Sequence, residues 1–269
     1  MAPKKSLLKN NQQFLLLGFF VLLAVYTYFQ DRNKDDLSSL FEGYQGTMVV
    51  MELPSGQVER YKPARAAMRL SPCSTFKIAN ALIGLETGVL SGPDHLLTWD
   101  GKVRSRPVDN QNHTLQTAID NSVVWYFQAL AAAVGPERMG HYVKALDYGN
   151  QDISGGITRF WLGSSLKISA DEQVEFLRKL YEDALPIEPR HQALVREMLK
   201  LKKTPQYQLS GKTGTNLVGG KATLGWFVGH LALADKAYVF ACNIEAPDQA
   251  TGAKARQIAE KALHAKGLI

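Results

Sequence analysis

The sequence predicts an α+β fold in which strands from both ends of the chain form one antiparallel sheet flanked by helices. Two observations predict it. Strand-like segments occur near both ends, at 46–62 and 208–244, whereas apolar residues three and four positions apart dominate between them. Separate runs of strands and helices are typical of α+β proteins. We therefore expect a helical subdomain at about 90–200 and a ligand cleft where it meets the sheet.

The first strands are expected in "GTMVVMEL" and "QVERYK", and Pro54, Ser55 and Gly56 between them predict a hairpin. Helical periodicity begins near residue 72 and continues in "SVVWYFQALAAAV" and "ADEQVEFLRKLYEDAL", interrupted by Gly and Pro. Strands are predicted again in "QLSGKTGT", "ATLGWFVGHLAL" and "KAYVFACNI". The last element, "GAKARQIAEKALHAK", is predicted to be a helix.

Composition narrows the class of protein and of partner. With 269 residues, 45% of them hydrophobic and 21% charged, the chain is a folded globular protein. Its net charge of +6 comes from scattered basic residues, without a basic helix or zinc-finger spacing, so no nucleic acid is expected. An anionic small molecule fits better. Cys73 and Cys242 lie in apolar contexts and predict two buried free thiols, with a single bridge left open.

Residues 1–36 are expected to form a separate leader and linker, and 37–269 the functional domain. Three lysines precede the apolar run "FLLLGFFVLLAVYTYF", and the polar "QDRNKDD" follows it. This is the layout of an export signal or membrane anchor. We favour an uncleaved anchor because no good cleavage site is present, and a cleaved signal is the alternative. The protein would then lie on the periplasmic side of the inner membrane, or be periplasmic or secreted after cleavage.

The segment "SPCSTFKIANALIGLETG" places a hydroxyl and an amine one helical turn apart. Ser74 and Lys77 would meet on one face of a helix. A buried lysine that loses its proton can activate a serine as a nucleophile. The pattern S-x-x-K occurs three times, also at Ser6 and Ser164, so it is weak by itself. Only Lys77 begins a strongly apolar helix, whereas Lys167 is expected on a solvated one.

A second motif, "KTG", occurs once, in the predicted strand at 208–215. Gly214 would let a ligand lie close to the strand, and Lys212 and Thr213 could contact an anionic group. A plain turn is the alternative. A P-loop is excluded, because Gln206 occupies the position of its first glycine.

Five ordered segments together are similar to the class D serine β-lactamases, the oxacillinase family. They are "PCSTFKIANALIGLETG", "NSVVWYFQ", "YGN", "FWLGSSLKISADEQ" and "GKTGT", and the resemblance extends from about residue 43 to about residue 262. It implies the fold of serine β-lactamases and penicillin-binding transpeptidases. The usual S-D-N motif of such enzymes is absent, and Ser122, Val123 and Val124 stand instead.

The resemblance implies a role for each motif residue. Ser74 would be acylated by a β-lactam, and Lys77, carboxylated by carbon dioxide or bicarbonate, would be the general base. Ser122 would relay a proton toward the leaving nitrogen, and Lys212 would adjust the local field. No other cofactor is implied, and the six dispersed histidines imply no metal.

It also implies residues for binding. The N–H groups of Ser74 and Thr215 would form an oxyanion hole. The drug's carboxylate would be held by Thr213 and Arg256. Trp161 would donate to the carbamate, with Val124 and Leu162 as apolar walls.

Some properties stay open. The family's frequent aromatic wall is missing from "RSRPVDNQNHTL", so the substrates among penicillins, cephalosporins and carbapenems are not predicted. A homodimer is expected from the family alone. Two other functions compete with hydrolysis: a β-lactam sensor that acylates without turnover, and a penicillin-binding protein acting on peptidoglycan.

Overall fold

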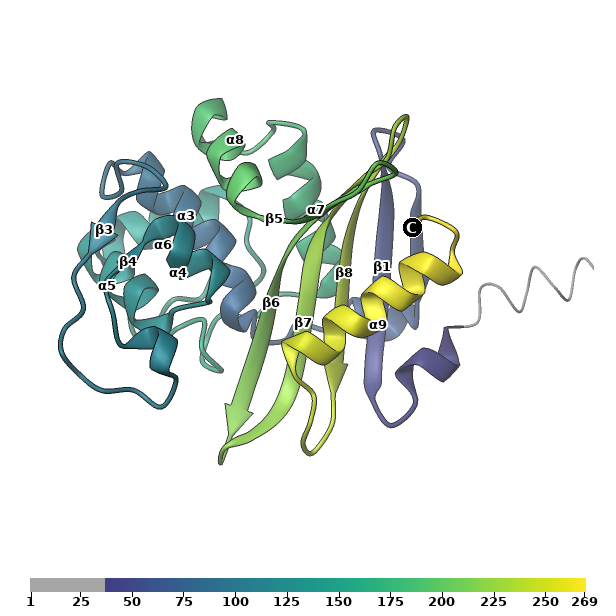
Figure 1. Ribbon diagram of the computed structural model, residues 1–269, viewed down its shortest axis with the longest axis horizontal. Helices are drawn as coiled ribbons and strands as arrows, with labels where there is room; N and C mark the ends of the chain where they lie inside the picture. Colours follow the sequence, from purple (N-terminus) through teal and green to yellow (C-terminus); the bar gives the residue numbers. More distant parts are fainter. Residues whose placement is uncertain (1–36) are drawn as a thin grey trace, which may run out of the picture.

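The computed structural model describes residues 37–269, and six strands form an antiparallel sheet beside the helices of the middle of the chain (Figure 1). The strands lie in the order β2-β1-β8-β7-β6-β5, so both ends of the chain contribute neighbouring strands. The bounds are β1 Gln45–Leu53, β2 Val58–Tyr61, β5 Lys200–Lys203, β6 Gln208–Val218, β7 Lys221–Ala232 and β8 Ala237–Glu245.

The remaining elements lie before, between and after these strands. They are η1 Ser38–Phe41, α2 Pro63–Ala66, η2 Cys73–Phe76, α3 Lys77–Glu86, β3 Leu96–Leu97, η3 Pro107–Asp109, β4 His113–Thr114, α4 Leu115–Asp120, α5 Val124–Val134, α6 Pro136–Ala145, α7 Ala170–Tyr181, α8 Pro189–Met198 and α9 Gly252–Ala265. In Figure 1 α9 covers one face of the sheet, and the helices of the middle of the chain lie behind and beside the other.

Strand β8 is buried on both faces because it lies inside the sheet between two apolar layers. Phe240 and Cys242 pack in the cluster that includes α9, whereas Val239 and Ala241 belong to the larger cluster with α3, α5 and α7. This alternation is the two-residue period of a strand. Both faces of the sheet are therefore needed to complete the core.

The β5 edge of the sheet lies next to the motif strand β6 and carries no apolar cover. All four residues of β5 are exposed, and three of them are lysines. Exposed lysines on an edge strand disfavour pairing with another chain. We infer that this edge is protected by charge.

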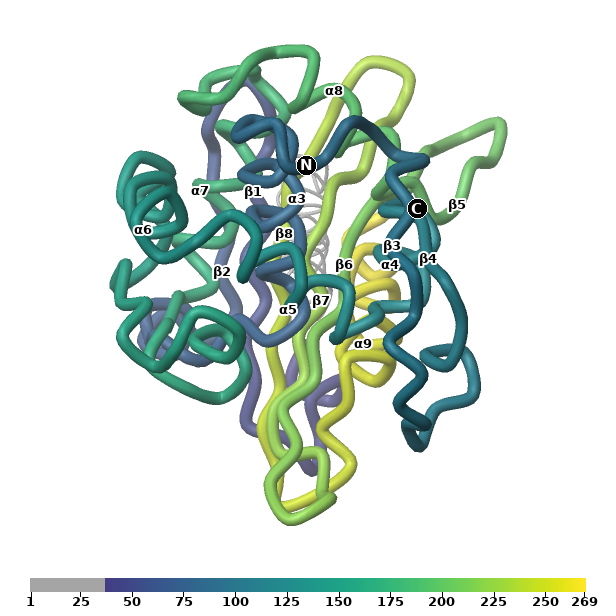
Figure 2. Tube along the Cα trace, turned by 90° about the vertical axis from the view of Figure 1, so that its left-hand side faces the viewer, coloured from purple at the N-terminus to yellow at the C-terminus, as the bar shows by residue number. Residues whose placement is uncertain are grey.

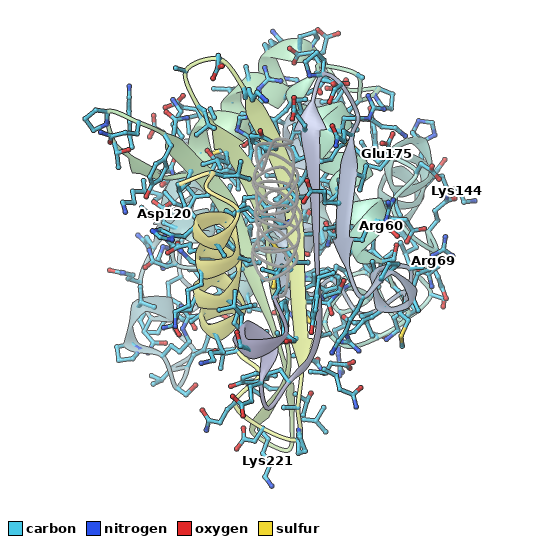
Figure 3. The ribbon with its side chains drawn as sticks, turned by 90° about the vertical axis from the view of Figure 1, so that its right-hand side faces the viewer. Arg60, Arg69, Asp120, Lys144, Glu175 and Lys221 are labelled. Carbon is cyan, nitrogen blue, oxygen red and sulfur yellow. The ribbon has the colours of Figure 1, made fainter. Side chains whose placement is uncertain are left out.

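Ion pairs join the opposite edge of the sheet to α7. Arg60 Nε lies 2.7 Å from Asp171, and Arg69 contacts Glu172, with both arginines labelled on the same side of Figure 3. Glu172 also accepts from the backbone N–H of Ser169 and so completes the capping box of α7. Such exposed pairs contribute little stability individually, but they define where α7 begins.

Helix α3 is the centre of the helical part, where α5 and α6 pack against it (Figure 2). Nine consecutive residues, from Lys77 to Leu85, are buried. The sequence of a helix that is buried on all sides is typically apolar throughout. Lys77 is the one charged residue in this run. The helix therefore places an amine inside the core.

The predicted fold class is confirmed, including the first hairpin, the returning strands and the last helix. Cys73 and Cys242 are both free and buried, as expected. The predicted anchor lies outside the described residues. Among residues 37–269, no helix combines the length and the hydropathy that crossing a membrane requires.

Candidate active site

The Ser74 hydroxyl and the Lys77 amine meet at the beginning of α3. Ser74 lies in the 3₁₀ turn η2, which continues directly into α3, and Lys77 is the first residue of that helix. Lys77 Nζ is 2.6 Å from Ser74 Oγ. Ser74 is half-buried, whereas Lys77 is only 1% exposed. The geometry therefore gives the hydroxyl a proton acceptor at hydrogen-bond distance.

The surroundings of Lys77 disfavour its charged form. Burial lowers the pKa of the Lys77 amine well below its ordinary value, and the positive charges of Lys212 and Arg106 lower it further. Cys73, with an effect larger than that of Arg106, and Asp109 act in the opposite direction. The balance favours the neutral amine, whose lone pair can accept a proton or react with an electrophile.

The second serine–lysine pair joins the helical part to the sheet. Ser122 lies in the turn between α4 and α5 with a φ of 55°, in the left-handed region. Its hydroxyl accepts from Lys212 Nζ at 3.0 Å, and Lys212 is on β6. Burial and, secondarily, the charge of Arg106 lower the pKa of Lys212 to about 8, against a small opposing effect of Asp120. This amine can therefore both give and take a proton near neutral pH.

The glycine of "KTG" allows β6 to approach the nucleophile segment. A Cβ at Gly214 would lie 2.9 Å from the Pro72 carbonyl and 3.2 Å from the Ser74 nitrogen. The glycine was predicted to make room for a ligand, but its nearest neighbours belong to the protein's own η2 segment. A side chain at this position would push β6 away from the nucleophile segment, because real Cβ atoms essentially never lie within 3.0 Å of another heavy atom.

Thr213 and Arg256 line one small cavity of about 100 Å³ together with Lys212 and Asp120. Arg256, on α9, donates from Nε to Glu260 at 2.7 Å and lies over the ring of Phe227. The structure thus brings the two predicted carboxylate contacts to one place beside Lys212.

Trp161 is fully buried against Phe76, and among residues 37–269 its indole N–H has no hydrogen-bond partner. Buried N–H groups are almost always paired, which makes this N–H a candidate donor for a bound group. The segment is held close to the nucleophile because Ser71 Oγ donates to the Trp161 carbonyl at 3.0 Å. Val124 and Leu162, the other two predicted wall residues, are half-buried.

Of the two other S-x-x-K matches, the one within residues 37–269 does not form a comparable site. The prediction of a solvated helix for Lys167 is wrong, because Ser164 and Lys167 lie in the irregular segment before α7. Asn150 holds that segment by accepting from the Lys167 backbone N–H at 2.8 Å. The match at Ser6 lies outside the described residues.

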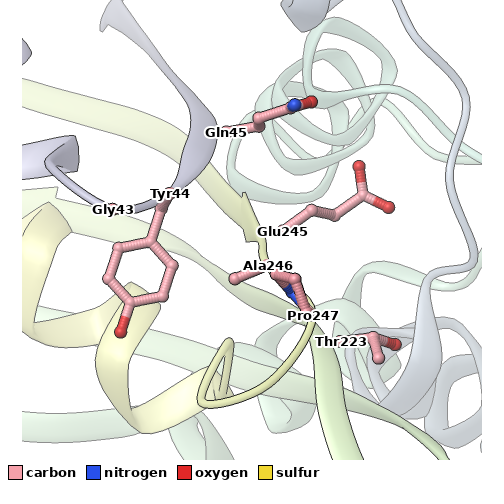
Figure 4. A pocket seen from close by; sticks show the side chains of 7 residues that line it. All are labelled: Gly43, Tyr44, Gln45, Thr223, Glu245, Ala246 and Pro247. Atoms are coloured by element: carbon pink, nitrogen blue, oxygen red, sulfur yellow. The ribbon is translucent and has the colours of Figure 1, made fainter.

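A larger surface pocket of about 640 Å³ lies elsewhere, at the ends of β1 and β8 (Figure 4). Its lining includes Tyr44, Thr223 and Glu245 but neither serine–lysine pair. Over residues 37–269, no group of three or more histidine, cysteine, aspartate or glutamate side chains is arranged to hold a metal ion.

Three residues near the site have no sequence signal that would have identified them. Ser71 connects the nucleophile segment to the Trp161 segment, and the charges of Arg106 and Asp120 act on Lys212. Each is a common residue type whose partner lies far away in the sequence. Glu260 holds Arg256 from four residues further along α9, a spacing that the sequence does show.

Comparisons with known proteins agree with this geometry. Residues 46–264 match the model of the penicillin-binding protein transpeptidase domain. The chain is 40% identical over 254 residues to the probable β-lactamase YbxI of Bacillus subtilis, covering 94% of this chain and 93% of that one.

Solved structures extend the likeness. The class D β-lactamase BAT-2 has a TM-score of 0.82 and 37% identity, covering 87% of this chain and 96% of its own. The C-terminal domain of the Bacillus licheniformis BlaR penicillin-receptor has a TM-score of 0.83 and 33% identity, covering 87% and 96%. Since sequence and structure agree over nearly all of residues 37–269, the chain belongs to the class D β-lactamase family.

Proposed function

We propose that the protein hydrolyses β-lactam antibiotics through an acyl-enzyme on Ser74, with Lys77 carrying the general base. The observation that carries this proposal is the 2.6 Å separation of Lys77 Nζ and Ser74 Oγ, with the amine withdrawn from water. A serine hydroxyl needs such a partner to become a nucleophile. The family membership supports the β-lactam as substrate.

In the acylation step, Ser74 Oγ attacks the β-lactam carbonyl carbon and its proton moves to the base at Lys77. The carbonyl carbon–nitrogen bond then breaks, and the leaving nitrogen receives a proton from Ser122. Lys212 Nζ, 3.0 Å from Ser122 Oγ, replaces that proton. A pKa of about 8 suits Lys212 to this exchange at neutral pH.

The oxyanion that develops on the carbonyl oxygen would be held by the backbone N–H groups of Ser74 and Thr215. Ser74 lies in the first turn of the joined η2 and α3, where N–H groups lack an intrahelical acceptor. Gly214 brings Thr215 to the same place. One such donor is typically worth about 3 kcal/mol of barrier.

The residues around Lys77 suit a carboxylated lysine. Only a neutral amine reacts with carbon dioxide, and the lowered pKa of Lys77 favours that form. The unpartnered Trp161 N–H supplies a donor for an anionic oxygen, and Val124 and Leu162 limit water. When carboxylated, Lys77 supplies an oxygen base for acylation and for the water that hydrolyses the ester.

A β-lactam sensor is the second candidate, favoured by the likeness to the BlaR penicillin-receptor domain. A peptidoglycan transpeptidase is less well supported, because this chain has valine at 124 where an S-x-N motif has asparagine. All three functions acylate Ser74, so labelling does not separate them. Turnover does.

We also propose that the catalytic domain works outside the cytoplasm, tethered to the inner membrane by its N-terminal segment. The basic, apolar and polar order of residues 1–36 supports export. Cell fractionation and sequencing of the mature N-terminus test this. Recovery with membranes and an intact N-terminus is expected; a chain beginning near residue 25–31 would show cleavage instead. A homodimer is proposed from the family alone, and sedimentation would test it.

The first activity prediction concerns turnover. Purified protein should convert many equivalents of a chromogenic cephalosporin or a penicillin, and Ser74→Ala should reduce kcat roughly 10⁴-fold or more, because the nucleophile is lost. Ser164→Ala, in the unrelated S-x-x-K match, is the control and should retain activity. Product that stops at one equivalent for both drugs would favour the sensor.

A second prediction concerns the base. Since protonated Lys77 cannot hold a carboxyl group, activity should fall in bicarbonate-free buffer as the pH decreases through its lowered pKa, and bicarbonate should restore it. Trp161→Phe should need more bicarbonate for half-maximal activity, whereas Trp99→Phe should not. Carbon-13 NMR with labelled bicarbonate should show a carbamate resonance. An enzyme that is indifferent to bicarbonate and lacks this resonance would contradict the proposal.

A third prediction concerns the carboxylate. Arg256→Ala should raise KM for carboxylate-bearing β-lactams about 10- to 100-fold with a smaller effect on kcat, the range expected when a charge-assisted hydrogen bond is lost. Lys254→Ala, on the same helix over the ring of Tyr44, is the control. Equal KM values for Arg256→Ala and the wild type would assign the drug carboxylate to other residues.

A further inference from the structure

Arg106 reaches from the segment before η3 to the turn that carries Ser122. Its Nη2 donates to the Asn121 carbonyl at 2.5 Å, and it pairs with the Asp109 carboxylate at 3.7 Å. The Asp109 side chain is only 10% exposed, which fixes one end of the pair. The guanidinium is 48% exposed, so it remains next to solvent.

This contact fixes the peptide group that precedes Ser122. The Ser122 N–H and the Asn121 carbonyl belong to the same planar unit. The N–H donates to the Ile119 carbonyl at 3.1 Å, and the carbonyl accepts from Arg106. Because this plane is held from both sides, and the Val123 N–H of the next peptide donates to the Ala118 carbonyl at 2.9 Å, rotation about the Ser122 N–Cα bond, its φ angle, is restrained.

Restraint matters here because Ser122 has a φ of 55°. A non-glycine residue in the left-handed region is strained by about 1 kcal/mol or more and persists only where its surroundings hold it. An extended or helical φ would turn the side chain elsewhere. The 3.0 Å contact between Ser122 Oγ and Lys212 Nζ depends on the observed value.

We propose that Arg106 is a positioning residue, which locks the Asn121–Ser122 peptide so that the Ser122 hydroxyl faces Lys212. The inference rests on the proposed function for its catalytic consequence, since Ser122 is the proton donor in that scheme. It assigns a role within "RSRPVDNQNHTL", the segment in which the expected aromatic wall is missing.

The charge of Arg106 supplies a second, measurable effect. It lowers the pKa of both Lys77 and Lys212. The other charged or titratable neighbours act from different elements: Cys73 from η2, Asp109 from η3 and Asp120 from α4. Removing the Arg106 charge therefore raises both pKa values, and the amines become protonated at higher pH.

The test compares Arg106→Gln, Arg106→Lys and the matched control Arg104→Gln. Arg104 lies in the same segment but pairs with Asp100 at 2.8 Å and stacks over Trp125. Arg106→Gln should lower kcat about 10- to 100-fold with KM within about threefold, the scale of a lost charged hydrogen bond. The acidic limb of the pH–rate profile of this variant should move to higher pH. Arg106→Lys should keep the acidic limb of the wild-type pH–rate profile, because the charge is retained, while kcat still falls. Arg104→Gln should match the wild type in both kcat and the pH–rate profile.

Hydrogen exchange of the Ser122 amide gives a readout that does not depend on turnover. It should accelerate in both Arg106 variants and not in Arg104→Gln, at equal thermal midpoints. Unchanged exchange and kcat in Arg106→Gln, or equal losses in Arg104→Gln, would overturn the proposal. Mass spectrometry of wild-type protein treated with a penicillin keeps the two hypotheses separate. Absence of an adduct on Ser74 would reject the proposed function, and the exchange result would still decide the role of Arg106.

Discussion

Burial of the Lys77 amine at the beginning of α3 is the constraint on which the rest of the site depends. An isolated ammonium inside a core is costly, so burial shifts the equilibrium toward the neutral amine. The positive end of the α3 dipole acts in the same direction, since a cation is disfavoured at a helix N-terminus. The amine 2.6 Å from Ser74 is therefore shifted toward its neutral form because of where the helix is packed.

The site is assembled from three segments that are distant in the sequence. They are the joined η2 and α3, the turn between α4 and α5, and strand β6. The sheet fixes β6, the aromatic packing of Phe76 against Trp161 fixes η2, and Gly214 sets the spacing between them. Movement of β6 away from the turn would separate Lys212 from Ser122, whereas Ser74 and Lys77 lie in one continuous segment.

Sequence patterns predicted the sheet, the helical middle and the meeting of Ser74 with Lys77, because these depend on local periodicity or on recognisable motifs. The family resemblance implied Ser122 and Lys212, but not that the two side chains form a pair. Sequence patterns did not predict what lies around the pairs. The prediction of a solvated helix at Lys167 is wrong, because the sequence of a short polar run does not reveal whether the run is helical or is an irregular segment held by Asn150. The Gly214 contact and the Arg106 reach to Asn121 depend on groups brought together only by the fold, whereas Arg256 and Glu260 are four residues apart on α9.

The buried thiols have a consequence for how the protein meets an electrophilic drug. Cys73 directly precedes Ser74, yet its sulfur contacts Ser71 at 3.6 Å and not the lysine amine. Burial raises the pKa of Cys73 to about 11, so the thiol stays protonated at neutral pH and is a poor competitor for acylation. Of these two adjacent residues with nucleophilic side chains, only Ser74 is therefore expected to react with the drug. Oxidants that modify thiolates should leave this site unchanged.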